Sequence, residues 1–96
     1  MKSRKTIDYE DYLISTLDNK KEAAGYLNAA LAGGEIDVFL LALRDVIIAQ
    51  GGLAPLAQKI HCSRSSLYKT LSQKGNPEFK NISKILRALD MQLTIS

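Results

Sequence analysis

The chain has 96 residues, of which 46% are hydrophobic and 24% charged, so its length allows one domain with a single core. Its apolar runs fall short of the ~20 residues that a membrane span needs, and we expect a cytoplasmic protein without a signal peptide. A single cysteine, Cys62, excludes an internal disulfide and supplies no pair of metal ligands, so we expect no metal or other cofactor.

The formal net charge of +3 is unevenly distributed along the chain. Residues 1–52 carry six Lys or Arg against eight Asp or Glu, a balance of −2. Residues 53–96 carry seven against two, a balance of +5. A basic half joined to an acidic half indicates a polyanionic partner for the first and another task for the second. Charge alone would be explained equally well by solvated side chains on helix surfaces.

The N-terminal part predicts two helices. Residues 8–17 carry apolar side chains at helical spacing and begin with acids, which the helix dipole favours at a helix start. Asn19 followed by Glu22 is typical of a capping box, which opens a second helix that Gly33 and Gly34 end. The apolar face of this second helix is expected to comprise Ala23, Tyr26, Leu27, Ala30 and Leu31.

Residues 35–50 predict the central helix of the fold. This segment is apolar around most of its circumference, as expected for the central buried helix. The pair Gly51 and Gly52 is expected to end it.

The elements that follow are shorter. Residues 53–61 predict one helix, with Pro55 tolerated in its first turn, and residues 64–72 predict another. Residues 81–89 predict a final helix, and residues 91–95 alternate apolar and polar side chains, which is a strand period. We therefore expect an all-α fold of five to six helices with a short C-terminal β-strand, for which the edge of a second copy is a candidate partner.

Residues 53–74 predict a helix-turn-helix that binds DNA. Two helices joined by a turn of about three residues cross steeply, and the small residue needed where they touch is Ala57. Ser63 is expected to accept an N–H bond from the first turn of the second helix. The predicted interior comprises Leu53, Leu56, Ile60, Cys62, Leu67 and Leu71. The outward residues offer two cations, short hydroxyls, one amide and one aromatic ring without an acid, which suits a major groove. The predicted DNA contacts are Ser63, Arg64, Ser65, Ser66, Tyr68, Lys69, Gln73, Lys74 and Asn76.

Each outward residue also has a less specific interpretation. Arg64 and Lys69 could contact base edges, contact phosphate or simply be solvated, and phosphate contacts are the more common kind. Tyr68 could touch DNA or pack against its neighbours, and Ser63 could act as a cap alone. Phosphate contacts are also conceivable for Gln50, Lys59, Lys80 and Asn81.

The run Leu56-Ala57-x-x-x-His61-Cys62-Ser63-Arg64-x-Ser66-Leu67 resembles the Cro/repressor-type (Xre) helix-turn-helix pattern. The resemblance covers about residues 36–90 and implies a lambda-repressor-like domain. His61 stands where that family has a glycine with positive φ, and His tolerates this conformation better than most residues. As the sole histidine of the chain, His61 is expected to be structural and not a metal ligand or catalyst.

A narrower resemblance extends over nearly the whole chain. The segments AAGYLNAALAGGEIDVFLLALRDVIIAQGG and SRSSLYKTLSQKGNPEFKNISKILRAL are similar to HigA-like addiction module antidote proteins, the antitoxins of toxin–antitoxin systems. The resemblance implies neutralisation of a RelE/ParE-like toxin. It also implies transcription regulation, in which a homodimer binds double-stranded operator DNA and represses its own operon. Residues 1–34 would then form a helical extension packed on the main domain, residues 35–96.

The acidic and aromatic N-terminal segment is a candidate surface for the toxin, because such a helix complements a basic protein. The residues predicted for this contact are Tyr9, Tyr12, Leu13 and Leu17. The alternative is that these side chains pack in the core or within their own helix.

Three other functions compete with a DNA-binding antitoxin. A stand-alone or phage-type Xre repressor would bind DNA without a toxin partner, and a pure protein-interaction domain would leave the face of residues 64–73 inert. An enzyme is not expected, because the sequence lacks a Ser/His/Asp set, a metal cluster and a Gly-rich phosphate loop.

Overall fold

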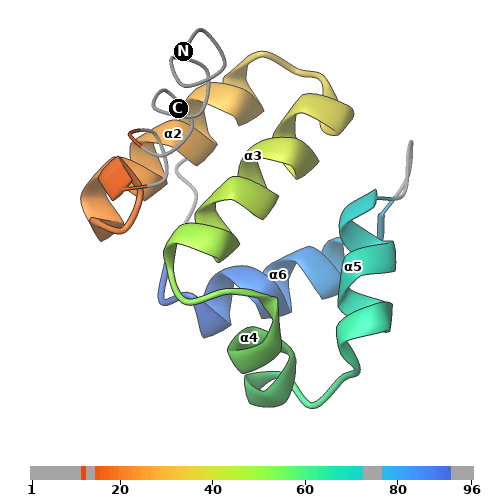
Figure 1. Ribbon diagram of the computed structural model, residues 1–96. Helices are drawn as coiled ribbons and strands as arrows, with labels where there is room; N and C mark the ends of the chain where they lie inside the picture. Colours follow the sequence, from red (N-terminus) through yellow and green to blue (C-terminus); the bar gives the residue numbers. More distant parts are fainter. Residues whose placement is uncertain (1–11, 13–14, 73–76, 92–96) are drawn as a thin grey trace, which may run out of the picture.

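The computed structural model describes residue 12 and residues 15–72 and 77–91, and within these residues the regular structure is helical (Figure 1). The helices are α2 (Lys20–Ala32), α3 (Ile36–Ala49), α4 (Leu53–Lys59), α5 (Arg64–Ser72) and α6 (Phe79–Ala88). The all-α prediction is therefore confirmed for the described residues. Of the predicted helix at residues 8–17, only residue 12 and residues 15–17 are described, and residues 12, 15 and 16 are helical.

Helix α2 begins where the capping signal predicts. The Asn19 side chain accepts hydrogen bonds from the backbone N–H groups of Lys21 at 2.8 Å and Glu22 at 3.1 Å, which satisfies two donors of the first turn. Ala23 and Leu27 are fully buried against the rest of the fold. The predicted apolar face is thus confirmed at its centre, whereas Leu31 at its edge is 39% exposed.

Helix α3 is central: α2 packs along one side of it, and α4 and α5 contact it elsewhere (Figure 1). Its buried side is formed by Phe39, Leu40, Ala42, Leu43, Val46 and Ile47. The prediction of a buried central helix holds for this side only, because Val38, Leu41 and Ile48 are 48%, 55% and 47% exposed. The described neighbours of α3 therefore leave an apolar strip in contact with solvent.

One hydrophobic core joins the N-terminal residues to the C-terminal helices. Leu17 and Leu27 belong to the same cluster as Ile47 of α3, Leu67 of α5 and Ile85 of α6, and each of these side chains is at most 2% exposed. Residues that precede α3 therefore pack on the main body of the fold. The functional division of the chain at residue 34 stays a prediction.

The turn after α4 uses a left-handed residue to end the helix. α4 ends at Lys59, and His61 adopts φ 56°. The His61 N–H bonds the Gln58 carbonyl at 3.2 Å, and the Cys62 N–H bonds the Ala57 carbonyl at 2.9 Å. This pair of bonds is a Schellman motif, which normally favours glycine at the left-handed position. The positive φ expected for His61 from the family pattern is thus confirmed.

The C-terminal helix ends in the same way. Asp90 adopts φ 61°, its N–H bonds the Arg87 carbonyl at 3.0 Å, and the Met91 N–H bonds the Leu86 carbonyl at 2.9 Å. Met91 is buried and lies outside any strand. The rest of the predicted strand, residues 92–95, lies outside the described residues, and the described part of the chain contains only helices and turns.

Candidate nucleic-acid interface

The predicted helix-turn-helix segment consists of α4, residues 60–63 and α5. Ala57 is 4% exposed, and Leu67 and Leu71 are each 2% exposed, so the three lie in the core as the sequence predicts. The Ser63 hydroxyl accepts a hydrogen bond from the Ser66 N–H at 3.0 Å and caps α5, also as predicted. These contacts fix which side of α5 faces inward.

The opposite side of α5 is open to solvent. The exposed residues are Arg64, Ser65, Ser66, Tyr68, Lys69 and Ser72. The helix RSSLYKTLS combines two cations, four hydroxyls and one phenol ring without an acid, so its outer surface attracts anions and offers hydrogen bonds. Gln73, Lys74 and Asn76, the remaining predicted contacts, lie outside the described residues.

A cation from α3 joins this surface. The Arg44 guanidinium lies over the Tyr68 ring, 5.2 Å from the ring centroid, in a cation–π contact. Tyr68 is nevertheless 48% exposed, so its other atoms are accessible. Arg44 was missed by sequence reasoning. The signal that could have found it is its position as the one cation in the otherwise apolar and acidic α3 sequence.

An open hollow of about 640 Å³ lies beside the exposed face of α5. Its α5 side is formed by Arg64, Ser65 and Tyr68, and its other side is formed by residues 51–55, where α4 begins. The beginnings of both helices therefore face the same concave surface. The cationic face of α5 therefore borders a concave surface on its α4 side. Arg44 adds a further cation next to Tyr68.

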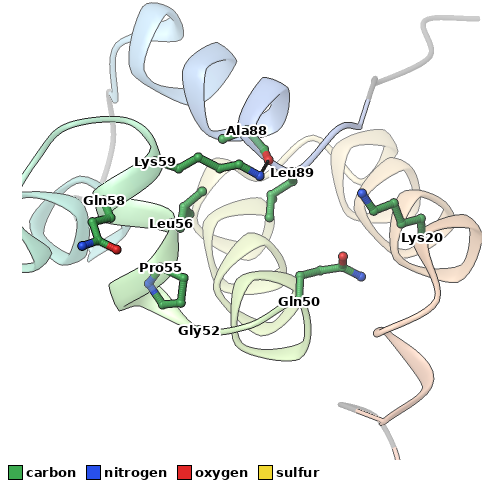
Figure 2. A pocket seen from close by; sticks show the side chains of 9 residues that line it. All are labelled: Lys20, Gln50, Gly52, Pro55, Leu56, Gln58, Lys59, Ala88 and Leu89. Carbon is green, nitrogen blue, oxygen red and sulfur yellow. Dashed lines mark hydrogen bonds between the residues drawn. The ribbon is translucent and has the colours of Figure 1, made fainter.

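Two polar residues considered for phosphate contact form hydrogen bonds to the backbone of other parts of the fold, and both are drawn in Figure 2. Gln50 Nε2 donates hydrogen bonds to the Leu17 carbonyl at 2.8 Å and the Asp18 carbonyl at 3.0 Å. Lys59 Nζ donates to the Ala88 carbonyl at 3.1 Å, at the end of α6. Both side chains satisfy backbone carbonyls near helix ends, so we assign them a structural role. Lys80 remains exposed and Asn81 is half-buried.

The residues predicted to meet a toxin are not brought together on the described surface. Tyr12 is helical and 68% exposed. Leu17 is only 2% exposed, because it packs in the core below the Gln50 bonds, and we therefore remove it from the contact set. Tyr9 and Leu13 lie outside the described residues.

The described residues contain no group of three or more His, Cys, Asp or Glu side chains that could hold a metal ion. Within the same residues, every helix is too short or too polar to cross a membrane. The exposed residues of α5 offer positive charge, hydrogen-bonding groups and one aromatic ring.

The chain is similar to known proteins over most of its length. A family model described as "probable addiction module antidote protein" matches residues 5–96. An uncharacterized protein of Haemophilus influenzae is 35% identical over 79 residues, which are 82% of this chain and 80% of the relative. No solved structure matches the chain significantly. The family match covers both the basic α4–α5 region and the acidic N-terminal half.

Proposed function

This chain belongs to the family of probable addiction module antidote proteins, and from this premise we propose that it is a DNA-binding antitoxin. In this proposal it neutralises a RelE/ParE-like toxin and, as a homodimer, represses the operon that encodes both proteins. The α4–α5 segment acts as an Xre-type helix-turn-helix within a lambda-repressor-like domain, and the chain is HigA-like.

The observation that carries DNA binding is the acid-free, exposed face of α5 beside the start of α4. Helix α5 enters the major groove, where Arg64 and Lys69 reach guanine edges or flanking phosphates. The Ser65 and Ser66 hydroxyls donate hydrogen bonds to phosphate or base edges, and Tyr68 contacts a thymine methyl or the sugar backbone. Lys74 and Asn76 follow the helix in sequence and are proposed as phosphate contacts.

The symmetry of a dimer determines the symmetry of the operator that it binds. Two copies related by a twofold axis present two α5 helices, so the operator is expected to be a pseudo-palindrome with half-sites about 10 bp apart.

Titration of the DNA upstream of the chain's own gene tests the α5 face. The Arg64→Ala/Lys69→Ala variant is expected to bind at least about tenfold more weakly, and the slope of log K against log salt should fall by about 0.9 for each lost phosphate contact. Lys21→Ala is the matched control, because it removes an exposed cation from α2 and leaves α5 intact. Unchanged affinity and salt slope in the double variant would refute DNA recognition through α5.

Co-expression with the neighbouring gene product tests the antitoxin role. A stable complex that suppresses the growth defect caused by that product supports an antitoxin. DNA binding without any such complex supports the alternative, a stand-alone repressor.

A further inference from the structure

An apolar groove lies between α2 and α3, away from α5. It has a volume of about 310 Å³ and is lined by Tyr26, Ala29, Ala30, Val38, Leu41 and Ala42. Val38 and Leu41 are 48% and 55% exposed, although aliphatic side chains on a central helix are normally covered. The exposed Ile48 continues the same side of α3, ten residues after Val38. Exposed apolar strips of this kind mark interaction sites.

The two helices that form the groove are linked directly to each other. α2 and α3 are joined by only three residues, Gly33 to Glu35, and lie side by side (Figure 1). The Tyr26 hydroxyl donates a 3.0 Å hydrogen bond to Asp45 Oδ2 and links the two helices. A carboxylate has about four acceptor positions, so Asp45 can hold Tyr26 and still accept bonds from a partner.

Helix spacing places acidic residues beside the positions that line the groove. Asp45 lies four residues after Leu41, and Asp37 lies four residues before it, so all three share one side of α3. Glu22 precedes Tyr26 by four residues on α2 and shares its side of that helix. A partner segment in the groove would therefore meet carboxylates from both helices.

The described cations of α2 and α3 are directed elsewhere. Lys20 forms an ion pair with Asp90 at 3.7 Å, and Lys20 and Lys21 both line a different hollow that Arg87 also borders. Arg44 is drawn toward α5, where it lies over Tyr68. The groove thus presents apolar side chains bordered by carboxylates.

We propose that this groove is the docking site for a basic partner protein, which inserts an apolar side-chain ridge flanked by Lys or Arg. Arg and Lys next to such a ridge would pair with Asp37, Asp45 and Glu22. Nucleic acid and anionic lipid are disfavoured, because the carboxylates repel phosphate. A second copy is disfavoured, because a twofold contact brings identical acidic patches together. The identity of this partner as the toxin rests on the proposed function.

The test uses the full chain and the purified product of the neighbouring gene as the probe. Leu41→Lys is expected to weaken the complex by at least about 30-fold, as for a central interface residue. Leu31→Lys is the matched control, because Leu31 is an exposed leucine of α2 outside the groove, and it should change affinity by less than about threefold. Leu41→Ala is a milder change at an exposed position and controls for an effect on folding. It should weaken binding less than Leu41→Lys but more than Leu31→Lys.

A variant at an acidic position beside the groove separates the contribution of charge to binding from that of apolar contact. Asp37→Asn should slow association and reduce the salt dependence of binding, whereas Leu41→Lys should mainly speed dissociation. Both variants should bind operator DNA within about threefold of the wild type, because neither lies on α5.

The outcomes distinguish this inference from the proposed function. If the wild type binds the probe and Leu41→Lys binds it equally well, the groove is not the docking site, while the antitoxin proposal stands. If the wild type does not bind the probe, both fail. If Leu41→Lys converts a wild-type dimer into a monomer in sedimentation, the groove is a contact between copies and the inference is overturned.

Discussion

The left-handed turn between α4 and α5 stores backbone strain that a single substitution should release. His61 adopts φ 56°, where an L-residue costs about 1–2 kcal/mol relative to the right-handed region, with His toward the lower end. Glycine removes this cost but loses about 0.5–1 kcal/mol more chain entropy on folding. Because the His61 side chain is exposed, its removal forfeits little packing. His61→Gly should therefore stabilise the fold by up to about 1 kcal/mol.

Urea unfolding followed by far-UV circular dichroism measures this change, with m expected to stay constant. One kcal/mol corresponds to about 4–8 °C in Tm for a domain of this size, so a rise of a few degrees is expected. His61→Ala keeps the Cβ and should not stabilise, whereas Asp90→Gly, at φ 61° in the matching turn after α6, should stabilise. A loss of stability in both glycine variants would refute the argument from turn strain.

Three further substitutions probe contacts that position α5 and the N-terminal residues, with Lys84→Ala on the exposed side of α6 as a neutral control. Leu67→Ala removes a side chain that is 2% exposed and should lower the unfolding free energy by about 2–5 kcal/mol in urea titrations. Ser63→Ala removes the cap on the Ser66 N–H and should cost about 0.5–2 kcal/mol, whereas Ser63→Gly should cost a few tenths; equal costs would contradict a capping role. Gln50→Ala deletes two hydrogen bonds to carbonyls preceding α2 and should cost about 1–3 kcal/mol, with faster amide exchange there; unchanged exchange would contradict the tether.

Local signals made much of the fold predictable. Asn19 marks the start of α2, paired glycines follow α2 and α3, and the predicted range 64–72 coincides with α5. The inward and outward sides of α5 were also predictable, because Leu67 and Leu71 recur at helical spacing. Each of these features depends on neighbours within a few residues along the chain.

The features that the sequence did not reveal depend on contacts between distant residues. Gln50 and Lys59 were candidate phosphate contacts, but their acceptors lie 33 and 29 residues away in sequence. The position of Arg44 over Tyr68 likewise requires α3 and α5 to be packed together. The apolar circumference of α3 predicted a buried central helix, but hydrophobicity alone does not distinguish a core-facing leucine from an exposed one such as Leu41.

The shared core has a consequence for the lifetime of the protein in a cell. Leu17 and Leu27 before α3, and Leu67 and Ile85 after it, contact one continuous apolar interior, so no described helix has a core of its own. A domain of this kind opens as one cooperative unit, and proteases act on the opened state. Cleavage would therefore not leave behind a fragment that still binds DNA or still binds a partner. Under the proposed function, loss of the antidote and loss of repression would occur in the same event and at the same rate.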